Sequence, residues 1–416
     1  MLRNRTLLAI CLTVCAAYVG IGMVGPVRVL FAQAHGASLV IIGTMASAYL
    51  ISNFVFQYPV GWLADRWGRK EVMIVGLLAQ AMLSLAYLFV VDPILFVVLR
   101  FVEGVAAAAI LPPARALIVD TLPTSQQGEA YGVFNAFFNT GFLLGPGIGG
   151  LLATSGYASA FIGAALFRLV AIVIVVFAIP SQKHSTPITT HEEKKVSYKA
   201  LFVLPLLGAY ILALGDYLYL GFDLTLMPLW MHDHLGASVA VIGIAYMLWA
   251  IPNMVISPFS GRFIDRLRRR FWIILLCGLA QVPLYITYGL ANTALLVVIL
   301  FAVHGIVYAF MQPAMDTLVA SSSASPMRAR VQGLYATVGL IGAFVGASGF
   351  SQLYALNFRL PLFAMGLGFG ICVLIGSTLI RISEIRKQSM TNVVHNKTST
   401  CELAQTVRRA EESYKP

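Results

Sequence analysis

The sequence is poor in charge: only 11% of its 416 residues are Asp, Glu, Lys or Arg, whereas 59% are hydrophobic and the mean hydropathy is +0.84. Soluble domains average about 25% charged and about 45–50% apolar residues, so a soluble globular protein is excluded. Cysteine is also scarce. The five cysteines are scattered and have no CxxC or Cys/His spacing, so they indicate neither a disulfide framework nor a zinc site.

Acidic residues are fewer than basic ones, 17 Asp and Glu against 28 Lys and Arg, which gives a net charge of +11. Such an excess is typical of proteins that bind nucleic acid or anions. With the amino terminus placed in the cytoplasm, however, nearly all cations fall on that side. Only Arg28 and Arg359 lie near the opposite face, and Arg100 and Arg168 lie inside apolar runs. This is the positive-inside pattern. It predicts two cytoplasmic termini and no nucleic-acid partner.

Long polar segments are nearly absent, and apolar runs take their place. Each run is long enough for a membrane crossing of about 20 residues, and runs of this length favour helices over a barrel. The first run continues beyond the length of a signal peptide and is interpreted as a retained span. The sequence thus predicts an all-α membrane protein with twelve transmembrane helices, at roughly 7–31, 39–62, 71–91, 94–114, 128–153, 156–179, 201–230, 238–261, 271–290, 293–318, 330–355 and 360–380.

One polar interruption divides the chain into two similar halves. The predicted domains are a six-helix bundle at 1–180, a cytoplasmic linker at 181–199, a second six-helix bundle at 200–382 and a cytoplasmic tail at 383–416. Gly36-Ala37-Ser38 recurs as Gly236-Ala237-Ser238, and Pro113-Ala114 recurs as Pro313-Ala314, both at an offset of 200. Parallel repeats of six spans are the build of a transporter whose halves rock about a site near the midplane.

A charged turn separates the second and third predicted spans. It reads G-x-L-A-D-R-x-G-R-K. On charge alone it could be a solvated loop that obeys the positive-inside rule, but the complete pattern resembles the signature loop of the major facilitator superfamily. A degenerate copy lies where that family repeats the loop. The resemblance implies a conformational role for Gly61, Asp65, Arg66, Gly68, Arg69, Lys70, Asp265 and Arg266.

The fourth span carries Arg100 and, on the same helical face, Glu103. A charge at mid-bilayer costs about 2.5–3.5 kcal/mol on insertion scales, so such residues usually face inward and serve function. A purely structural ion pair is the alternative interpretation. The stretch Leu99-Arg100-Phe101-Val102-Glu103-Gly104, with its R-x-x-x-G spacing, is similar to the superfamily's fourth-span motif, which implies that Arg100 takes part in proton coupling.

The fifth span is rich in glycine, which by itself indicates close helix packing, and its proline predicts a bend or break. Its pattern G-x-x-x-G-P-x-x-G-G resembles the signature of drug:proton antiporters and favours export. The residues of this motif are Gly141, Gly145, Pro146, Gly149 and Gly150. The sequence departs from that branch at two positions. Gln127 stands in the loop between the fourth and fifth spans, where a basic residue is common before the glycine, and Phe301 stands in the second half where the fourth-span motif has its Arg.

Other polar residues in the spans are candidates for the transport pathway. Asp216 and Asp223 are seven residues apart and return to nearly the same helical face, where burial favours the protonated carboxyl and allows proton exchange. His304 aligns with Glu103 at an offset of 201 and titrates in a useful range, although a lone histidine often only bonds a neighbour. The uncharged cavity candidates, each equally compatible with helix packing, are Tyr49, Asn53, Gln57, Asn135, Asn139, Tyr246 and Asn253.

These features together predict a proton-coupled secondary transporter with the major facilitator fold, most consistent with a drug or metabolite exporter that works by alternating access. We expect a bacterial cell-membrane protein that acts as a monomer, takes a small-molecule substrate and needs no cofactor beyond the proton gradient. A proton-coupled importer of a sugar or organic acid uses the same fold. A transporter-like sensor or scaffold is the alternative from another class. No GxSxG, HExxH or P-loop motif indicates an enzyme.

Overall fold

The structure, a computed structural model, describes residues 4–180, 201–266, 270–322 and 328–412. The predicted linker at 181–199 lies outside these residues, so the predicted domain boundaries stay predictions. The described residues are almost entirely helical, and twelve segments are long and apolar enough to cross a membrane. The predicted fold class and span number are therefore confirmed.

The first half of the chain builds one bundle. Its helices, with two short 3-10 segments, are α1 (Arg5–Ala34), α2 (Leu39–Trp67), α3 (Arg69–Ala86), η1 (Tyr87–Phe89), α4 (Pro93–Ala108), α5 (Leu111–Thr121), α6 (Thr124–Leu152), η2 (Ala153–Ser155) and α7 (Tyr157–Ala178).

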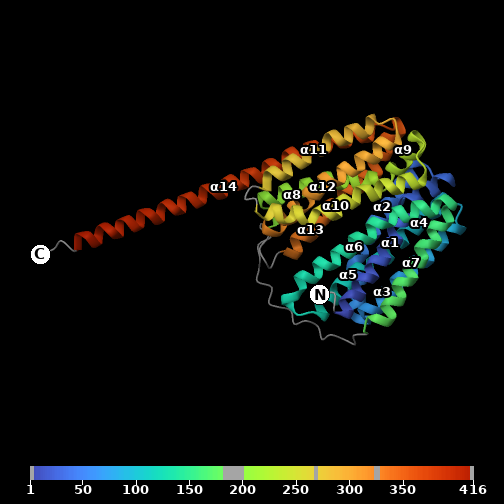
Figure 1. Cartoon of the computed structure of the whole chain (residues 1–416), viewed down its shortest axis with the longest axis horizontal. Coiled ribbons are helices and arrows are strands. Elements are labelled where there is room, and N and C mark those ends of the chain that lie inside the picture. The colour runs from blue at the N-terminus through green and yellow to red at the C-terminus, as the bar shows by residue number, and fades with distance from the viewer. Residues whose placement is uncertain (1–3, 181–200, 267–269, 323–327, 413–416) are drawn as a thin grey trace.

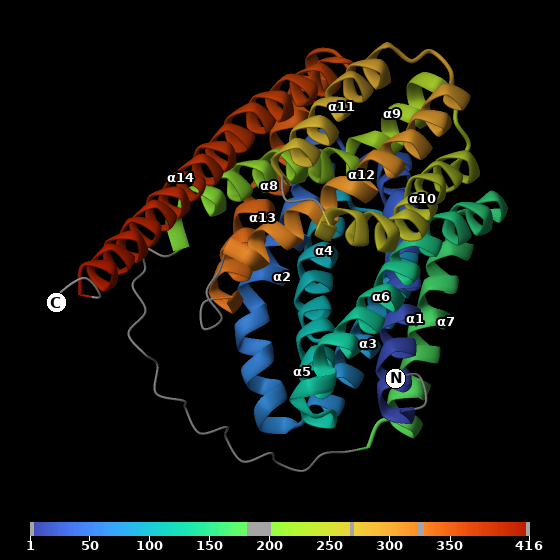
Figure 2. The same cartoon turned by 60° about the vertical axis from the view of Figure 1, so that its left-hand side comes forward.

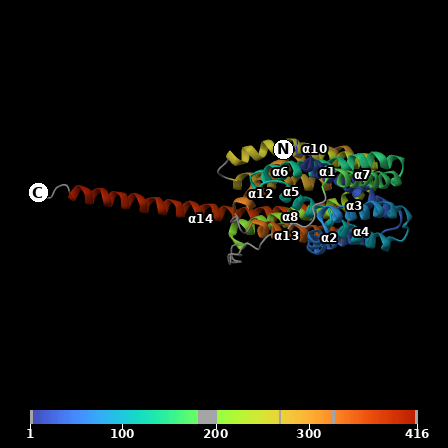
Figure 3. The same ribbon diagram turned by 90° about the horizontal axis from the view of Figure 1, so that it is seen from below.

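The second half builds the other bundle, and the two lie side by side (Figures 1 and 3). Its helices are α8 (Leu204–Asp223), α9 (Leu226–Leu235), α10 (Val239–Arg266), α11 (Arg270–Leu290), α12 (Ala294–Ser322), α13 (Arg328–Leu356) and α14 (Leu360–Glu412). The last helix continues far beyond its apolar part and projects from the bundle as a single rod toward the carboxyl end (Figure 1).

Two of the twelve spans are broken, which the apolar pattern did not predict. The fourth span divides into α4 and α5 just before Pro112 and Pro113, which lack N–H donors and disfavour a helical residue ahead of them. The seventh span divides into α8 and α9 at Leu224 and Thr225, and the ring of Pro228 would clash with the carbonyl of residue 224 in a continuous helix. By contrast, α6 runs unbroken through Pro146, so that proline does not interrupt its helix.

The two halves touch at one end of the molecule. We call this the closed end; it holds the connection between α1 and α2. There Gln33 donates to Asp233 (2.6 Å), and the hydroxyls of Ser47 and Ser348 lie 2.6 Å apart. At the other end, the open end, which holds the α2–α3 turn at Gly68, the helices of the two halves diverge (Figure 2). No hydrogen bond between described residues joins the halves there.

Candidate functional site

A cavity of about 460 Å³ lies between the two halves. Both bundles line it, through α1, α2, α4 and α6 on one wall and α8, α10, α12 and α13 on the other. Most of its lining is apolar or aromatic, including Tyr18, Phe138, Phe142, Tyr217 and Trp249. A largely apolar pocket with a few polar groups is the usual form of a small-molecule site.

The wall from the first half carries two arginines. Arg100 on α4 donates from Nη1 to Glu103 Oε2 (3.0 Å), one turn along the same helix. Arg28 on α1 donates from Nη2 to the other oxygen of Glu103 (3.0 Å), which is almost fully buried. The hydroxyl of Tyr87 also donates to Glu103 (3.3 Å). One carboxylate therefore holds two guanidinium groups at the cavity.

The position of Arg28 differs from the one expected from the sequence. Arg28 was expected near the membrane face, but it is 6% exposed, lines the cavity and pairs with Glu103. The reason is the length of α1, whose 30 residues continue to Ala34 and so place Arg28 well inside its end. The signal that could have found it is the lone Glu103, which needs more than Arg100 to satisfy both carboxylate oxygens in a buried site.

A third arginine is buried behind this wall. Arg168 on α7 is fully buried, and it donates to Gln80 (3.1 Å) and Ser84 on α3. It makes no ion pair within the part of the chain that the structure describes. Its Nη2 has no hydrogen-bond partner, so this cation is satisfied only by neutral groups.

The wall from the second half carries carboxylates. Asp216 on α8 accepts from the hydroxyl of Tyr308 on α12 (3.1 Å), and that hydroxyl also lies 2.7 Å from Gln312 Oε1. Gln312 in turn donates to Asp316, an exposed residue one turn nearer the open end (3.3 Å). Hydrogen bonds thus connect the acid in the cavity with an exposed acid on α12.

Asp223 lies at the break in the seventh span, at the end of α8, and also lines the cavity. Its backbone carbonyl accepts from the hydroxyl of Tyr246 on α10 (2.8 Å), while its buried Oδ1 has no hydrogen-bond partner. The predicted pair Asp216 and Asp223 therefore faces one cavity. Neither acid has a basic partner among the residues the structure describes.

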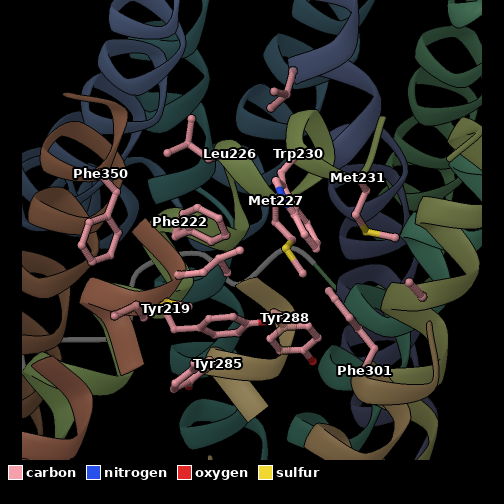
Figure 4. Close-up of a cluster of buried hydrophobic side chains, with 14 of the residues drawn as sticks. Tyr219, Phe222, Leu226, Met227, Trp230, Met231, Tyr285, Tyr288, Phe301 and Phe350 are labelled. Atoms are coloured by element: carbon pink, nitrogen blue, oxygen red, sulfur yellow. The ribbon is translucent and has the colours of Figure 1, made fainter. Parts of the chain in front are cut away.

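His304 on α12 lines the cavity but is 1% exposed. Its Nε2 lies 3.1 Å from Gln281 Oε1, and its Nδ1 lies 3.5 Å from the hydroxyl of Tyr288. The rings of Tyr219, Tyr285 and Tyr288 lie around it, and these three tyrosines belong to the hydrophobic cluster drawn in Figure 4. Both ring nitrogens have neutral partners, and a neutral imidazole satisfies both contacts.

Of the uncharged candidates, the structure brings only Tyr49 and Tyr246 to the cavity. Asn53 donates to the backbone carbonyl of Gly104 (3.2 Å) and accepts from Gln57 (3.0 Å), so this pair ties α2 to α4. None of the candidate amides is part of the cavity lining. Gln57, Asn135 and Asn139 are exposed, and Asn253 accepts from Ser257.

The charged turn between α2 and α3 ties the first bundle together at the open end. Gly68 has a φ of +112°, a backbone conformation that favours glycine. Arg69 forms an ion pair with Asp120 on α5, and Lys70 donates to two carbonyls at the end of α7, those of Val176 (2.8 Å) and of the capping residue Ile179 (2.6 Å).

The outer part of this turn makes only local contacts among the described side chains. Asp65 is exposed and lies 3.6 Å from Arg69, while Arg66 lies over the ring of Trp62. The side chains of Asp265 and Arg266, the copy of this turn in the second half, lie outside the described residues.

The glycines of the fifth span let α6 approach two helices. Cβ atoms at Gly141, Gly145 and Gly149 would meet the backbone of α1. A Cβ at Gly150 would lie 2.6 Å from the carbonyl of Val239 on α10. The motif therefore packs α6 both within its own half and against the other half at the closed end.

Comparison with known proteins places this arrangement in a family. The profile of the Major Facilitator Superfamily matches residues 10–225 and 217–399. The chain is 24% identical over 406 residues to the quinolone resistance protein NorA of Staphylococcus aureus (strain MSSA476), covering 93% of this chain and 100% of that protein. It is 26% identical over 390 residues to multidrug resistance protein 2 of Bacillus subtilis (strain 168), with coverages of 91% and 95%.

Solved structures share the fold. A bacterial homolog of the human lysosomal transporter Spinster, in an inward-facing and unoccupied conformation, has a TM-score of 0.72 at 16% identity and covers 91% of this chain and 97% of its own. The human organic anion transporter MFSD10 (TETRAN) has a TM-score of 0.61 at 16% identity, with coverages of 90% and 99%. The fold, the cavity between pseudo-symmetric halves and the matching profile make this a multi-pass transport protein of the plasma membrane and not an enzyme. The chain belongs to the Major Facilitator Superfamily.

Proposed function

We propose that the chain exports small amphiphilic molecules in exchange for protons by alternating access. The observation that carries this proposal is the pair Asp216 and Asp223, which line an apolar cavity without a basic partner among the described residues. A carboxylate in such a place is either neutralised by a proton or balanced by a positive group of the cargo. Protons and cargo therefore compete for the same oxygens, and this competition couples their movements.

The hydroxyl of Tyr308 supports the role of Asp216. It carries a single proton but lies within hydrogen-bond distance of two acceptors, Asp216 and Gln312. When Asp216 is ionised, Tyr308 donates to it; when Asp216 is protonated, Asp216 donates to Tyr308, whose own proton turns to Gln312. Protonation thus reverses a hydrogen-bond direction that leads along α12 toward Asp316 at the open end.

The charge distribution and the relatives both support export as the direction of transport. The positive-inside pattern favours an orientation in which the open end and both termini face the cytoplasm. The cavity would then load from inside in the conformation described here, as an exporter requires. Two relatives are named for quinolone and multidrug resistance. Export of drug-like amphiphiles is in line with these names and with the aromatic lining of the cavity.

The test is proton movement by purified protein in liposomes as tetraphenylphosphonium and a panel of aromatic amines are added. We expect cargo to trigger proton release by the wild type, and Asp216→Asn and Asp223→Asn to lose that release. Asp92→Asn is the matched control, since Asp92 only caps α4 at an exposed turn and asparagine caps equally well. Proton uptake with cargo would favour symport instead. Equal proton release by the wild type and both cavity variants would remove these acids from the mechanism.

A further inference from the structure

The buried charges of the first half do not cancel. The buried Arg28 and Arg168 and the partly buried Arg100 face one acid, Glu103, within the described residues of that bundle, which leaves two positive charges in excess. A net buried charge is costly unless a counter-charge balances it. Two of the three arginines line the cavity, so a counter-charge supplied from the cavity would reach them.

Glu103 does not exhaust the donors of these two arginines. Each guanidinium has five N–H donors, and each gives one nitrogen to Glu103, Arg28 to Oε1 and Arg100 to Oε2. The Nε of Arg28 is buried and has no hydrogen-bond partner. Donors of both arginines are therefore left for a further acceptor.

Aromatic rings hold both guanidinium groups in place. The Cζ of Arg100 lies 4.1 Å from the ring centre of Tyr49, and the Cζ of Arg28 lies 5.3 Å from that of Tyr87. Contacts of this kind stabilise the cation and fix the plane of its fork. Two guanidinium groups held in fixed orientations beside one cavity are suited to bind a planar, bidentate anion, above all a carboxylate.

We propose that the cavity contains an anionic subsite, formed by Arg28 and Arg100, that binds one carboxylate of the cargo. The acids Asp216 and Asp223 lie on the opposite wall, and under the proposed function they take the positive group of the cargo. The preferred cargo is then an amphiphilic zwitterion, with an amine at one end, a carboxylate at the other and an apolar, preferably aromatic, body between them. This inference rests on the proposed function only for the amine end.

The experiment compares two compounds that differ only in the anionic group: 4′-(dimethylaminomethyl)biphenyl-4-carboxylic acid and its methyl ester. Binding is measured by calorimetry on the full chain in nanodiscs. We expect the wild type to bind the acid at least about tenfold more tightly than the ester, the value of one charge-assisted hydrogen bond. Arg28→Gln should lose most of this preference while its affinity for the ester stays within about twofold, which also shows that the variant is folded.

Two further variants sharpen the test. Arg28→Lys keeps the positive charge but not the planar guanidinium, and it should retain part of the preference for the acid over the ester. Arg115→Gln makes the same exchange as Arg28→Gln at an exposed site outside the cavity and should retain all of it. Equal affinity of the wild type for acid and ester, together with proton release on adding the ester, would overturn the subsite and leave the proposed function standing. Failure of both compounds to bind or to move protons would overturn both.

Discussion

The two halves of the molecule use the same framework with different chemistry. At an offset of 201, polar and aromatic residues in the spans of the first bundle correspond in sequence to residues in the spans of the second. The corresponding pairs are Gln80 and Gln281, Ser84 and Tyr285, Tyr87 and Tyr288, Arg100 and Phe301, Glu103 and His304, and Arg168 and Phe369.

The geometry of this framework survives in both halves. Tyr87 donates to Glu103 (3.3 Å), and Tyr288 lies 3.5 Å from His304, with the same separation of 16 residues. The first bundle uses the framework for a charged network of arginines around a glutamate, whereas the second uses it for a neutral histidine among tyrosines. Both halves therefore keep a contact between a tyrosine and the residue 16 positions later, but that residue is charged in the first half and neutral in the second. The difference gives the cavity a cationic wall in the first half, whereas the acids of the opposite wall, Asp216 and Asp223, come from α8 and lie outside this network.

The largest effect on stability is expected when the corresponding residues Glu103 and His304 are each replaced by glutamine. Glu103→Gln removes the one acid that, among the described residues, balances the guanidinium groups of Arg28 and Arg100, and it should lower the free energy of unfolding by about 3 kcal/mol. His304→Gln exchanges one neutral hydrogen-bonding group for another and should cost about 1 kcal/mol. Thermal unfolding of the two purified variants, followed by fluorescence, checks the order. Equal losses would contradict the distinction between a charged and a neutral network.

The sequence was sufficient for the fold, the span number and the family. Three patterns can be found directly in the sequence, and each corresponds to one feature of the fold. Long apolar runs correspond to the helices, the repeat at an offset of 200 to the two halves, and the turn from Gly61 to Lys70 to the family motif. The two broken spans were missed because hydropathy averages over the prolines at 112, 113 and 228 that end the helices.

Side-chain partners across helices were much harder to predict. Arg28 was placed at the membrane face because the end of an apolar run is poorly defined, whereas Asp216 and Asp223 were recognised since their spacing lies within one helix. The amides Asn135 and Asn139 share a helical face, but the sequence does not say which face of α6 meets the cavity. Tyr308 was missed although it lies one turn from His304, a spacing that could have indicated it.

A second prediction concerns packing that the two halves share. Gly104 touches the carbonyl of Tyr49, and Gly305 touches that of Trp249, so α4 and α12 each approach a neighbouring helix at the backbone. Gly104→Ala and Gly305→Ala should each destabilise the protein by about 2 kcal/mol through overpacking. Gly132→Ala is the control, since nothing lies near its added methyl group, and it should be neutral or slightly stabilising. A loss at only one of the two positions would show that the packing has diverged together with the charge.

A third prediction concerns an interaction found only in the second half. Position 107, which corresponds to Tyr308, is an alanine, so the first half lacks this hydroxyl. Tyr308→Phe removes the donor to Asp216 and should cost about 1 kcal/mol in stability. It should also reduce cargo-triggered proton release several-fold, measured with a pH-sensitive dye in liposomes. Tyr210→Phe, which removes a hydroxyl bonded to Leu201 away from the cavity, should leave proton release unchanged.

The smallest effect on stability is expected at the charged turns of the open end, where the halves are apart. Asp65 is exposed and lies 3.6 Å from Arg69, a surface pair worth less than about 1 kcal/mol, so Asp65→Asn should leave the unfolding temperature almost unchanged. Transport should nevertheless fall, because an acid at this position would stabilise the closure of the open end by facing the amino end of α13, where the helix dipole is positive.

Asp265→Asn in the degenerate copy should reduce transport less, since that turn lacks the Gly-Arg-Lys sequence of the first. Transport rates in vesicles, normalised to the amount of inserted protein, measure both variants. Undiminished transport by Asp65→Asn would show that the turn serves only to hold the first bundle together, through Arg69 and Lys70.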